Sequence, residues 1–487
     1  MADAVVFEKT YDAKLPEFRK PQVSFSEKIS DYLDSKKIKL YNHQADAYDA
    51  ICDGKNIIIT TPTASGKTLC YTLPIFDNLM KNSDARALFI YPTKALTRDQ
   101  LISIKEIDSE LNAKTKPAVY DGDTKTENRS AIRETSRVIL TNMYELHQIL
   151  PYRAKWGDFF TNLSFIVIDE AHKYRGVFGS NTALLIRRLR RICNYYDANP
   201  QFILSSATLG NSVNFAETLC GVSFDEINND GSPHAKKIFR IYNDPNKTSI
   251  ASAANLVSEN IKSGRQTICF TKSRTTAEIT AVKCRDSKIA GNIASYRGGY
   301  RPDERRRIEA NLKNGEVSGV FSTNALEVGI DIGGLDSVVI SGFPGSMTSF
   351  LQQAGRAGRK YQDSEITFVA GQSPIDQYYV KNPDSFFDLP TEEAILGIEN
   401  PYILSAHLLC ACSELPYNSV RDRKYFGKTA DDLIENLREK RTVASTKRGY
   451  VYCGTENPAQ TNTFFGTIGK IWAVVFGKNT LETMDDS

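Results

Sequence analysis

Short apolar runs rich in isoleucine, valine and phenylalanine recur along the chain, and longer segments with a helical spacing of apolar residues separate them. Runs this continuous are typical of strands buried on both faces, and their alternation with helices indicates parallel α/β sheets. The predicted strands form two series, residues 56–60, 87–91, 137–141, 165–168 and 202–205, and residues 267–271, 293–296, 319–322, 337–340 and 366–369. The predicted fold class is therefore α/β.

A cluster of turn-forming residues, Asn-Asn-Asp-Gly-Ser-Pro at positions 228–233, separates the two series and is the best linker candidate. We therefore place one α/β domain at residues 39–235 and a second at residues 236–385. Residues 1–38 are predicted to form an irregular or helical lead-in. An accessory region at residues 386–487 is predicted to be mainly helical, with helices at 392–398, 403–413 and 431–440 before a tail rich in glycine and threonine.

With 61 basic and 58 acidic side chains, the chain has a formal net charge of +3, which excludes a histone-like polycation but not a local basic groove. No run approaches the roughly 18 uninterrupted apolar residues of a membrane helix. The acidic start lacks the pattern of a signal peptide, so we expect a cytoplasmic protein with no membrane partner. The nine cysteines include no Cys-x-x-Cys pair, which favours reduced core cysteines over a zinc or disulfide framework.

Residues 61–68, Thr-Pro-Thr-Ala-Ser-Gly-Lys-Thr, follow a predicted strand and precede a helical pattern, which is the context of a P-loop. Backbone N–H groups of Thr63, Ala64, Ser65 and Gly66 are expected to cradle the phosphates of ATP. Lys67 would place its ammonium group on them, and the Thr68 hydroxyl would bind Mg²⁺. Threonine replaces the first glycine of the consensus, so the alternative is an ordinary strand-to-helix turn.

Two adjacent carboxylates, Asp169 and Glu170, end the predicted strand 165–168. They would be costly at the end of a buried strand unless they met a cation. Since open α/β sheets bind ligands at the carboxyl ends of their strands, we assign Asp169 to Mg²⁺ and Glu170 to the base that activates water. Taken alone, the segment could also be a solvated helix start.

Two arginines in the second domain, Arg356 and Arg359, stand on the glycine-rich segment Gln352–Arg359. Guanidinium groups that reach a γ-phosphate from another domain act as arginine fingers. A phosphate loop in one domain and fingers in the other would make ATP the ligand that joins them.

The order of these segments resembles that of a superfamily 2 helicase of the DEAH type over residues 38–385. The resemblance implies two tandem RecA-like domains that hydrolyse ATP and move along a nucleic acid. It further implies that Gln44 reads adenine, that Gly329 and Asp331 contact the nucleotide, and that coupling depends on His172, Ser206, Thr208 and Gln352. It also implies strand-phosphate contacts for Thr93, Lys94, Thr141, Asn142, Arg274, Thr323 and Asn324.

Further segments narrow the resemblance to the mitomycin repair factor A group of DNA helicases, related to the yeast RecQ4-like helicase. They are residues 62–71, 174–180, 296–300, 376–380 and 400–404. This resemblance implies 3′→5′ movement on single-stranded or partly duplex DNA, DNA repair at the nucleoid, and repair or defence proteins as candidate partners. The group continues into a cysteine-rich metal-binding domain, whereas only Cys453 follows residue 412 here, so we expect a truncated or a shortened member.

Several alternatives stay open at this stage. The basic runs 187–191 and 305–307 are either DNA contacts or solvated and ion-paired helix faces. Phe178 either senses bases or packs in the core. Because the assigned strand contacts are to phosphates, which DNA and RNA share, an RNA helicase is the second candidate. A non-catalytic DNA-binding scaffold is the third.

Overall fold

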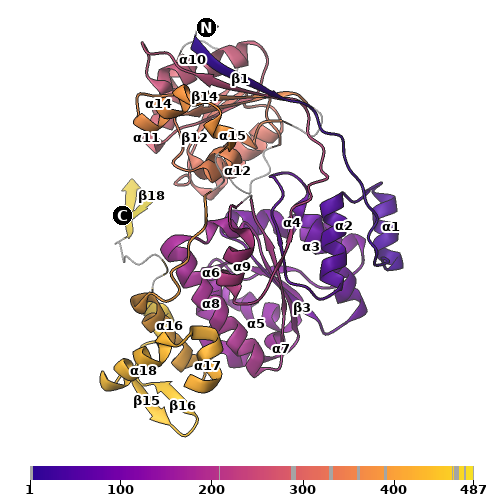
Figure 1. Cartoon of the computed structure of the whole chain (residues 1–487), viewed down its shortest axis with the longest axis vertical. Coiled ribbons are helices and arrows are strands. Elements are labelled where there is room, and N and C mark those ends of the chain that lie inside the picture. The colour runs from indigo at the N-terminus through magenta and orange to yellow at the C-terminus, as the bar shows by residue number, and fades with distance from the viewer. Residues whose placement is uncertain are drawn as a thin grey trace.

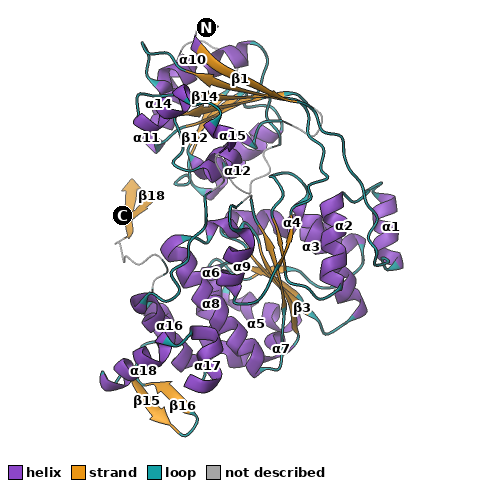
Figure 2. Ribbon diagram, viewed as in Figure 1, coloured by secondary structure: helices purple, strands orange, loops and turns teal. Residues whose placement is uncertain are grey.

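The computed structural model describes residues 4–207, 209–286, 292–327, 333–358, 362–388, 392–462, 464, 471–476 and 479–485. Figure 1 shows domain 2 at the top, domain 1 in the middle and residues 401–452 of the accessory region at the bottom. Both domains have a sheet between layers of helices (Figure 2), parallel throughout in domain 1 and parallel except for one edge strand in domain 2, so the predicted α/β class with two tandem RecA-like domains is confirmed.

Domain 1 is built on a seven-stranded sheet in the order β4-β5-β3-β6-β7-β2-β8. Its strands are β2 (Ile57–Ile59), β3 (Arg86–Ile90), β4 (Ala118–Val119), β5 (Val138–Thr141), β6 (Leu163–Ile168), β7 (Gln201–Ser205) and β8 (Asp225–Ile227). Its helices are α1 (Glu27–Ser35), α2 (Asn42–Cys52), α3 (Lys67–Lys81), α4 (Lys94–Glu110), α5 (Thr126–Thr135), α6 (Met143–Ile149), η2 (Leu150–Trp156), α7 (Gly157–Thr161), η3 (Ala171–Lys173), α8 (Gly176–Tyr195) and α9 (Ser212–Cys220). Side chains alternate between two buried clusters, Ile58 facing one and Ile57 and Ile59 the other, because successive residues of a strand point to opposite faces.

Domain 2 has a sheet in the order β1-β9-β14-β13-β10-β12-β11. Its strands are β1 (Val5–Tyr11), β9 (Lys237–Tyr242), β10 (Thr267–Phe270), β11 (Ile293–Tyr296), β12 (Gly319–Ser322), β13 (Ser337–Ser341) and β14 (Ser364–Val369). Its helices are α10 (Ser249–Lys262), α11 (Arg274–Asp286), α12 (Pro302–Lys313), η4 (Asn324–Leu326), α13 (Met347–Ala354), α14 (Pro374–Lys381) and α15 (Ser385–Asp388).

The N-terminal segment differs from the predicted irregular or helical lead-in, because it contains β1. This strand pairs antiparallel with β9 at the edge of the domain 2 sheet. Its exposure alternates along the strand, as expected when one face packs on the core and the other faces water.

Two antiparallel chain segments run together between the domains. The backbone N–H of Lys14 donates to the His234 carbonyl at 2.8 Å, that of His234 to the Lys14 carbonyl at 3.2 Å, and that of Glu17 to the Gly231 carbonyl at 2.9 Å. The predicted linker at residues 228–233 therefore has a partner from the N-terminal segment, and both segments cross between the domains (Figure 1).

The accessory region contains α16 (Pro401–Glu414), α17 (Ser419–Phe426), α18 (Thr429–Glu439), β15 (Val443–Thr446), β16 (Gly449–Tyr452), α19 (Pro458–Thr461), β17 (Ile471–Phe476) and β18 (Asn479–Asp485). The predicted helix at 392–398 is wrong, because the structure has no helix there. Domain 1 instead takes up its backbone groups: the Ile395 carbonyl accepts from Gly176 N–H at 3.1 Å, and the Gly397 N–H donates to Ser180 Oγ at 2.9 Å. The tail rich in glycine and threonine forms two antiparallel hairpins, neither of which is predicted from the sequence.

A buried ion pair fixes the accessory region to domain 1. Arg188 on α8 and Glu414 at the end of α16 both have side chains that are 0% exposed. The Arg188 guanidinium donates to both Glu414 carboxylate oxygens and lies 2.9 Å from His147 Nδ1 and 3.2 Å from His407 Nδ1. Burial, followed by the charge of Arg188, lowers the pKa of His147 to about 3, so this imidazole stays neutral.

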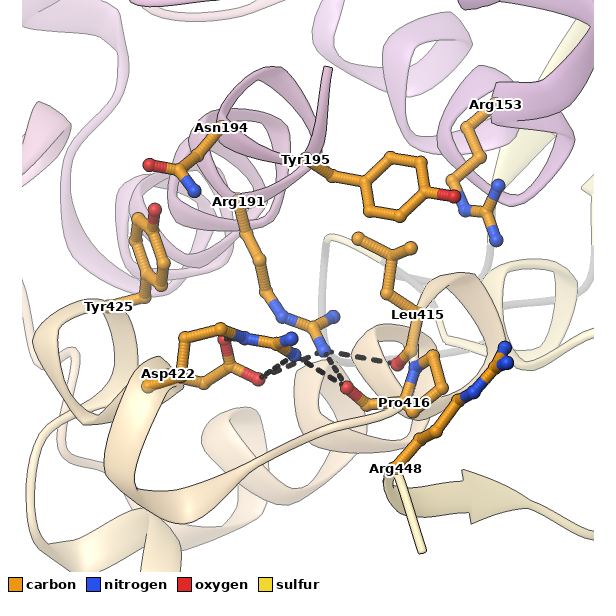
Figure 3. Close-up of a pocket in the computed structure, with 10 residues that line it drawn as sticks. Arg153, Arg191, Asn194, Tyr195, Leu415, Pro416, Asp422, Tyr425 and Arg448 are labelled. Carbon is orange, nitrogen blue, oxygen red and sulfur yellow. Dashed lines mark hydrogen bonds and ion pairs between the residues drawn. The ribbon is translucent and has the colours of Figure 1, made fainter. Parts of the chain in front are cut away.

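An arginine-rich cavity of about 370 Å³ lies beside this joint (Figure 3). Arg191 donates to the carbonyls of Ala411, Leu415 and Pro416 at 2.8, 3.0 and 2.8 Å and lies 3.0 Å from an Asp422 oxygen. These contacts satisfy carbonyls at the end of α16, where a helix has none of its own donors left. The cavity therefore belongs to the docking of the accessory region.

The Arg188 pair generates a stability prediction. Arg188→Met should leave the buried Glu414 carboxylate without its cation, which costs about 3–5 kcal/mol. We expect a lower urea midpoint and faster proteolytic release of the accessory region. The control is Lys447→Met, since Lys447 is exposed between β15 and β16 and does not line this cavity. An unchanged midpoint in Arg188→Met would show that the pair does not stabilise the joint.

Candidate functional site

The loop at residues 61–66 connects β2 to the first turn of α3, as predicted. Ala64 and Gly66 have positive φ angles of 62° and 83°, a geometry that turns successive N–H groups inward and favours anion binding. Lys67 Nζ donates to the carbonyls of Thr61 and Pro62, both at 2.8 Å, so its ammonium group lies over the loop. Burial lowers the pKa of Lys67, and the charges of Glu170 and Asp169 act in the opposite direction.

Two side chains of α2 hold this loop. Gln44 Oε1 accepts from the Tyr41 N–H at 3.0 Å, and its Nε2 donates to the Gly66 carbonyl at 3.0 Å. His43 Nε2 lies 3.1 Å from the Ser65 carbonyl, and its Nδ1 accepts from the Gly231 N–H at 3.3 Å. Sequence reasoning found Gln44 but missed His43, whose only signal was its place beside Gln44.

The carboxylates Asp169 and Glu170 follow β6 directly. Asp169 is buried, and one of its oxygens accepts from the Glu170 N–H at 3.0 Å. Glu170 has a φ of 51°, a left-handed conformation that is strained for a residue with a Cβ and is concentrated at functional sites. Burial, and then the neighbouring charge of Asp169, raises the pKa of Glu170 well above that of an ordinary glutamate. The pKa of Asp169 is also raised by burial.

His172 joins this segment to β7 and to domain 2. Its Nδ1 accepts from the Ala207 N–H at 3.2 Å and lies 3.5 Å from Ser206 Oγ and 3.5 Å from a Glu170 oxygen. Its Nε2 contacts the side-chain amide nitrogen of Gln352, on α13. Burial lowers the pKa of His172 well below its usual value, so a neutral imidazole connects the two domains.

The segment after α13 packs against the phosphate loop across the cleft. A Cβ added at Gly355 would overlap Thr63 Oγ1, so the backbone of domain 2 lies directly against the loop of domain 1. Arg356 donates from Nε and Nη2 to the Glu327 carbonyl at 3.3 and 3.0 Å. Glu327 also accepts from the Gln353 amide at 3.1 Å within domain 2, and sequence reasoning assigned a role to neither residue. Four predicted residues, Thr208, Gly329, Asp331 and Arg359, lie outside the described residues.

The residues assigned to strand phosphates in domain 1 lie at the carboxyl ends of β3 and β5. Thr93 and Asn142 cap the N-termini of α4 and α6. The Asn142 side-chain oxygen accepts a hydrogen bond from the Glu145 N–H at 3.0 Å. Lys94 is exposed and pairs with Asp123 at 2.6 Å. The Thr141 hydroxyl is buried and donates to the Tyr120 carbonyl at 2.7 Å. Its hydrogen is therefore already used in a bond within domain 1.

In domain 2 the assigned residues border a cavity of about 380 Å³ at the carboxyl ends of β10, β12 and β13. Thr323 and Asn324 line it together with Lys272, a cation that sequence reasoning did not assign. Arg274 starts α11 just beyond and is exposed. Glu327 also lines this cavity. It therefore connects the residues assigned to the nucleic-acid strand, Thr323 and Asn324, with Arg356, which is assigned to ATP.

Two RecA-like domains with a phosphate loop in one and an arginine segment packed against it from the other define a P-loop ATPase core of the helicase type. Comparison with known families agrees. Residues 41–215 match the DEAD/DEAH box helicase family, residues 249–361 the helicase conserved C-terminal domain, and residues 396–460 the winged helix domain of ATP-dependent helicase HRQ1. The chain belongs to the DEAD/DEAH-box helicases, in the group that carries the HRQ1-type winged helix domain.

Individual relatives support this assignment. The chain superimposes on the DUF1998 helicase MrfA bound to DNA with a TM-score of 0.94 and 38% identity, over 99% of this chain and 71% of that one. For MrfA bound to DNA and AMPPNP the TM-score is 0.92, at 38% identity over 99% and 70%. YprA of Bacillus subtilis, described as an uncharacterized ATP-dependent helicase, is 41% identical over 450 residues, which cover 90% of this chain and 60% of YprA. The predicted resemblance to the mitomycin repair factor A group is confirmed.

The contact between Gly355 and Thr63 generates a prediction about domain closure. Gly355→Ala should force the domains apart, because its methyl group has no space beside the Thr63 hydroxyl. Small-angle scattering should then show a larger radius of gyration. The control is Gly298→Ala, since a Cβ added at Gly298 meets open space.

Adding Thr63→Ala to Gly355→Ala removes the hydroxyl and should restore the compact form. If the double variant stays expanded, the effect comes from strain within domain 2 instead of from the cleft.

Proposed function

We propose that this chain is the motor of an ATP-dependent DNA helicase that moves 3′→5′ on single-stranded DNA in DNA repair. The observation that carries the proposal is the cross-cleft assembly, in which the Gly355 backbone and the Gln352 amide of domain 2 contact the phosphate loop and His172 of domain 1. The DNA-bound and AMPPNP-bound structures of MrfA support DNA and ATP as the ligands. A chromosomal substrate would place the protein in the cytoplasm at the nucleoid.

The residues of domain 1 fit ATP and Mg²⁺. Burial of Asp169 raises its pKa, so a divalent cation would offset the cost of its charge. Thr68 and Asp169 would hold Mg²⁺, which supplies charge neutralisation of the phosphates. The phosphate loop and Lys67 would bind the phosphates. Gln44 fixes the loop and, as the resemblance implies, would read the adenine base. Glu170 takes a proton from the attacking water, and Arg356, together with Arg359, supplies positive charge to the γ-phosphate.

ATP hydrolysis at this site should depend on nucleic acid. If DNA binding favours the closed cleft, single-stranded DNA should raise kcat above that of the chain alone. RNA of the same sequence should stimulate much less. Equal stimulation by RNA would favour the RNA helicase, and no hydrolysis with either strand would favour the scaffold. Displacement of streptavidin from a 5′-biotinylated strand, and not from a 3′-biotinylated one, tests the polarity.

Glu170 generates a pH prediction. A base works only when deprotonated, and its raised pKa should move the acid limb of kcat/KM to a higher pH than an ordinary glutamate gives. Glu170→Gln should lower kcat by about 10²-fold to 10⁴-fold, remove this limb and keep ATP binding. ATP turnover is measured at pH values from about 5 to about 9, in steps of about one unit, and the nucleotide Kd is measured at each pH. An unchanged limb in Glu170→Gln would assign the titration to another group.

A further inference from the structure

An ion pair joins the domains directly, without a nucleotide between its partners. Lys173 follows the Asp169–His172 segment in η3, and its Nζ donates to Glu327 Oε1 and to Gln352 Oε1, both at 3.2 Å. The Lys173 side chain is 32% exposed, whereas that of Glu327 is 2% exposed. The lysine therefore approaches from the side of the solvent and meets a carboxylate that is buried in domain 2.

Glu327 holds several groups of domain 2 at once. Its Oε1 accepts from Ser349 Oγ at 3.0 Å and its Oε2 from Gln353 Nε2 at 3.1 Å, which fixes α13. Its carbonyl accepts from Arg356, as described above. Ser349 and Gln353 are neutral, so among the described residues Lys173 is the cation that meets this carboxylate. A buried carboxylate that loses its cation is strongly destabilised, so the position of Glu327 depends on Lys173.

We propose that Lys173 and Glu327 are positioning residues that link closure of the cleft to the placement of Arg356. When the domains close, Lys173 reaches Glu327, and Glu327 orders α13 and the arginine that follows it. Because Glu327 also lines the cavity with Thr323 and Asn324, a strand bound there would act on the same residue. The inference rests on the proposed function for its catalytic consequence, but the closure itself does not need catalysis.

The test uses Lys173→Met, which removes the charge, and Lys173→Arg, which keeps it. With saturating single-stranded DNA, Lys173→Met should lower kcat by about 10-fold to 100-fold, while Lys173→Arg stays within about 3-fold of the unmodified chain. The nucleotide Kd should weaken less than kcat falls, because the phosphate loop keeps its own contacts. The matched control is Lys155→Met, an exposed lysine of domain 1 that stacks over Tyr152.

A double-mutant cycle with Glu327→Gln tests the pair itself. If the two residues act together, Lys173→Met with Glu327→Gln should lose no more activity than the worse single variant. Losses that multiply, or a full rate in Lys173→Met, would overturn the proposal.

Scattering without nucleotide separates this proposal from the proposed function. Lys173→Met should expand the chain and Lys173→Arg should not. If the unmodified chain hydrolyses no ATP with DNA but Lys173→Met still expands, the proposed function fails and the pair stands. If Lys173→Met remains as compact as the unmodified chain, the pair does not control closure.

Discussion

The contact between the two RecA-like domains is the constraint on which the rest of the structure depends. Domain 1 ends its central strands with a phosphate loop and two carboxylates, the buried Asp169 and the half-buried Glu170, whose charges are costly without a cation. Domain 2 brings a glycine to van der Waals distance of that loop and an amide to His172. Under the proposed function neither side completes the site alone, so the geometry of the cleft would decide whether hydrolysis occurs.

The chain connections are consistent with a cleft that opens and closes. The segments around Lys14 and His234 cross between the domains as an antiparallel pair, and residues 392–398 return along domain 1. The accessory region is instead fixed to domain 1 through the buried Arg188–Glu414 pair. Helix α8 has 20 residues, and it starts just after the Asp169–His172 segment and carries Arg188 and Arg191 toward the accessory region. From α16 onward the accessory region is thus fixed to domain 1, whereas Glu392, before α16, accepts hydrogen bonds from Thr348 of domain 2.

Local patterns predicted much of this structure. Strands buried on both faces were found because their apolar runs leave little ambiguity, and the motifs were found because they follow those strands. The strand β1 was missed because its alternating pattern needs a partner more than 200 residues away, at β9. The helix expected at 392–398 was wrong because domain 1 takes up its backbone hydrogen bonds.

The basic run 187–191 was ambiguous until the structure showed Arg187, Arg188, Arg190 and Arg191 bound to carbonyls and to Glu414. Lys173 and Glu327 were missed because their contact joins positions that no local pattern relates.

Reciprocal linkage between nucleotide and strand tests the central claim, that one closing cleft serves both ligands, most directly. The measurement is the Kd of a fluorescent DNA single strand with and without AMPPNP, beside the Kd of AMPPNP with and without the strand. The account predicts the same factor in both directions, within about 5-fold to 150-fold, because a coupling free energy is shared by the two sites. A factor of one in both directions would contradict it, since the two ligands would then bind to independent domains.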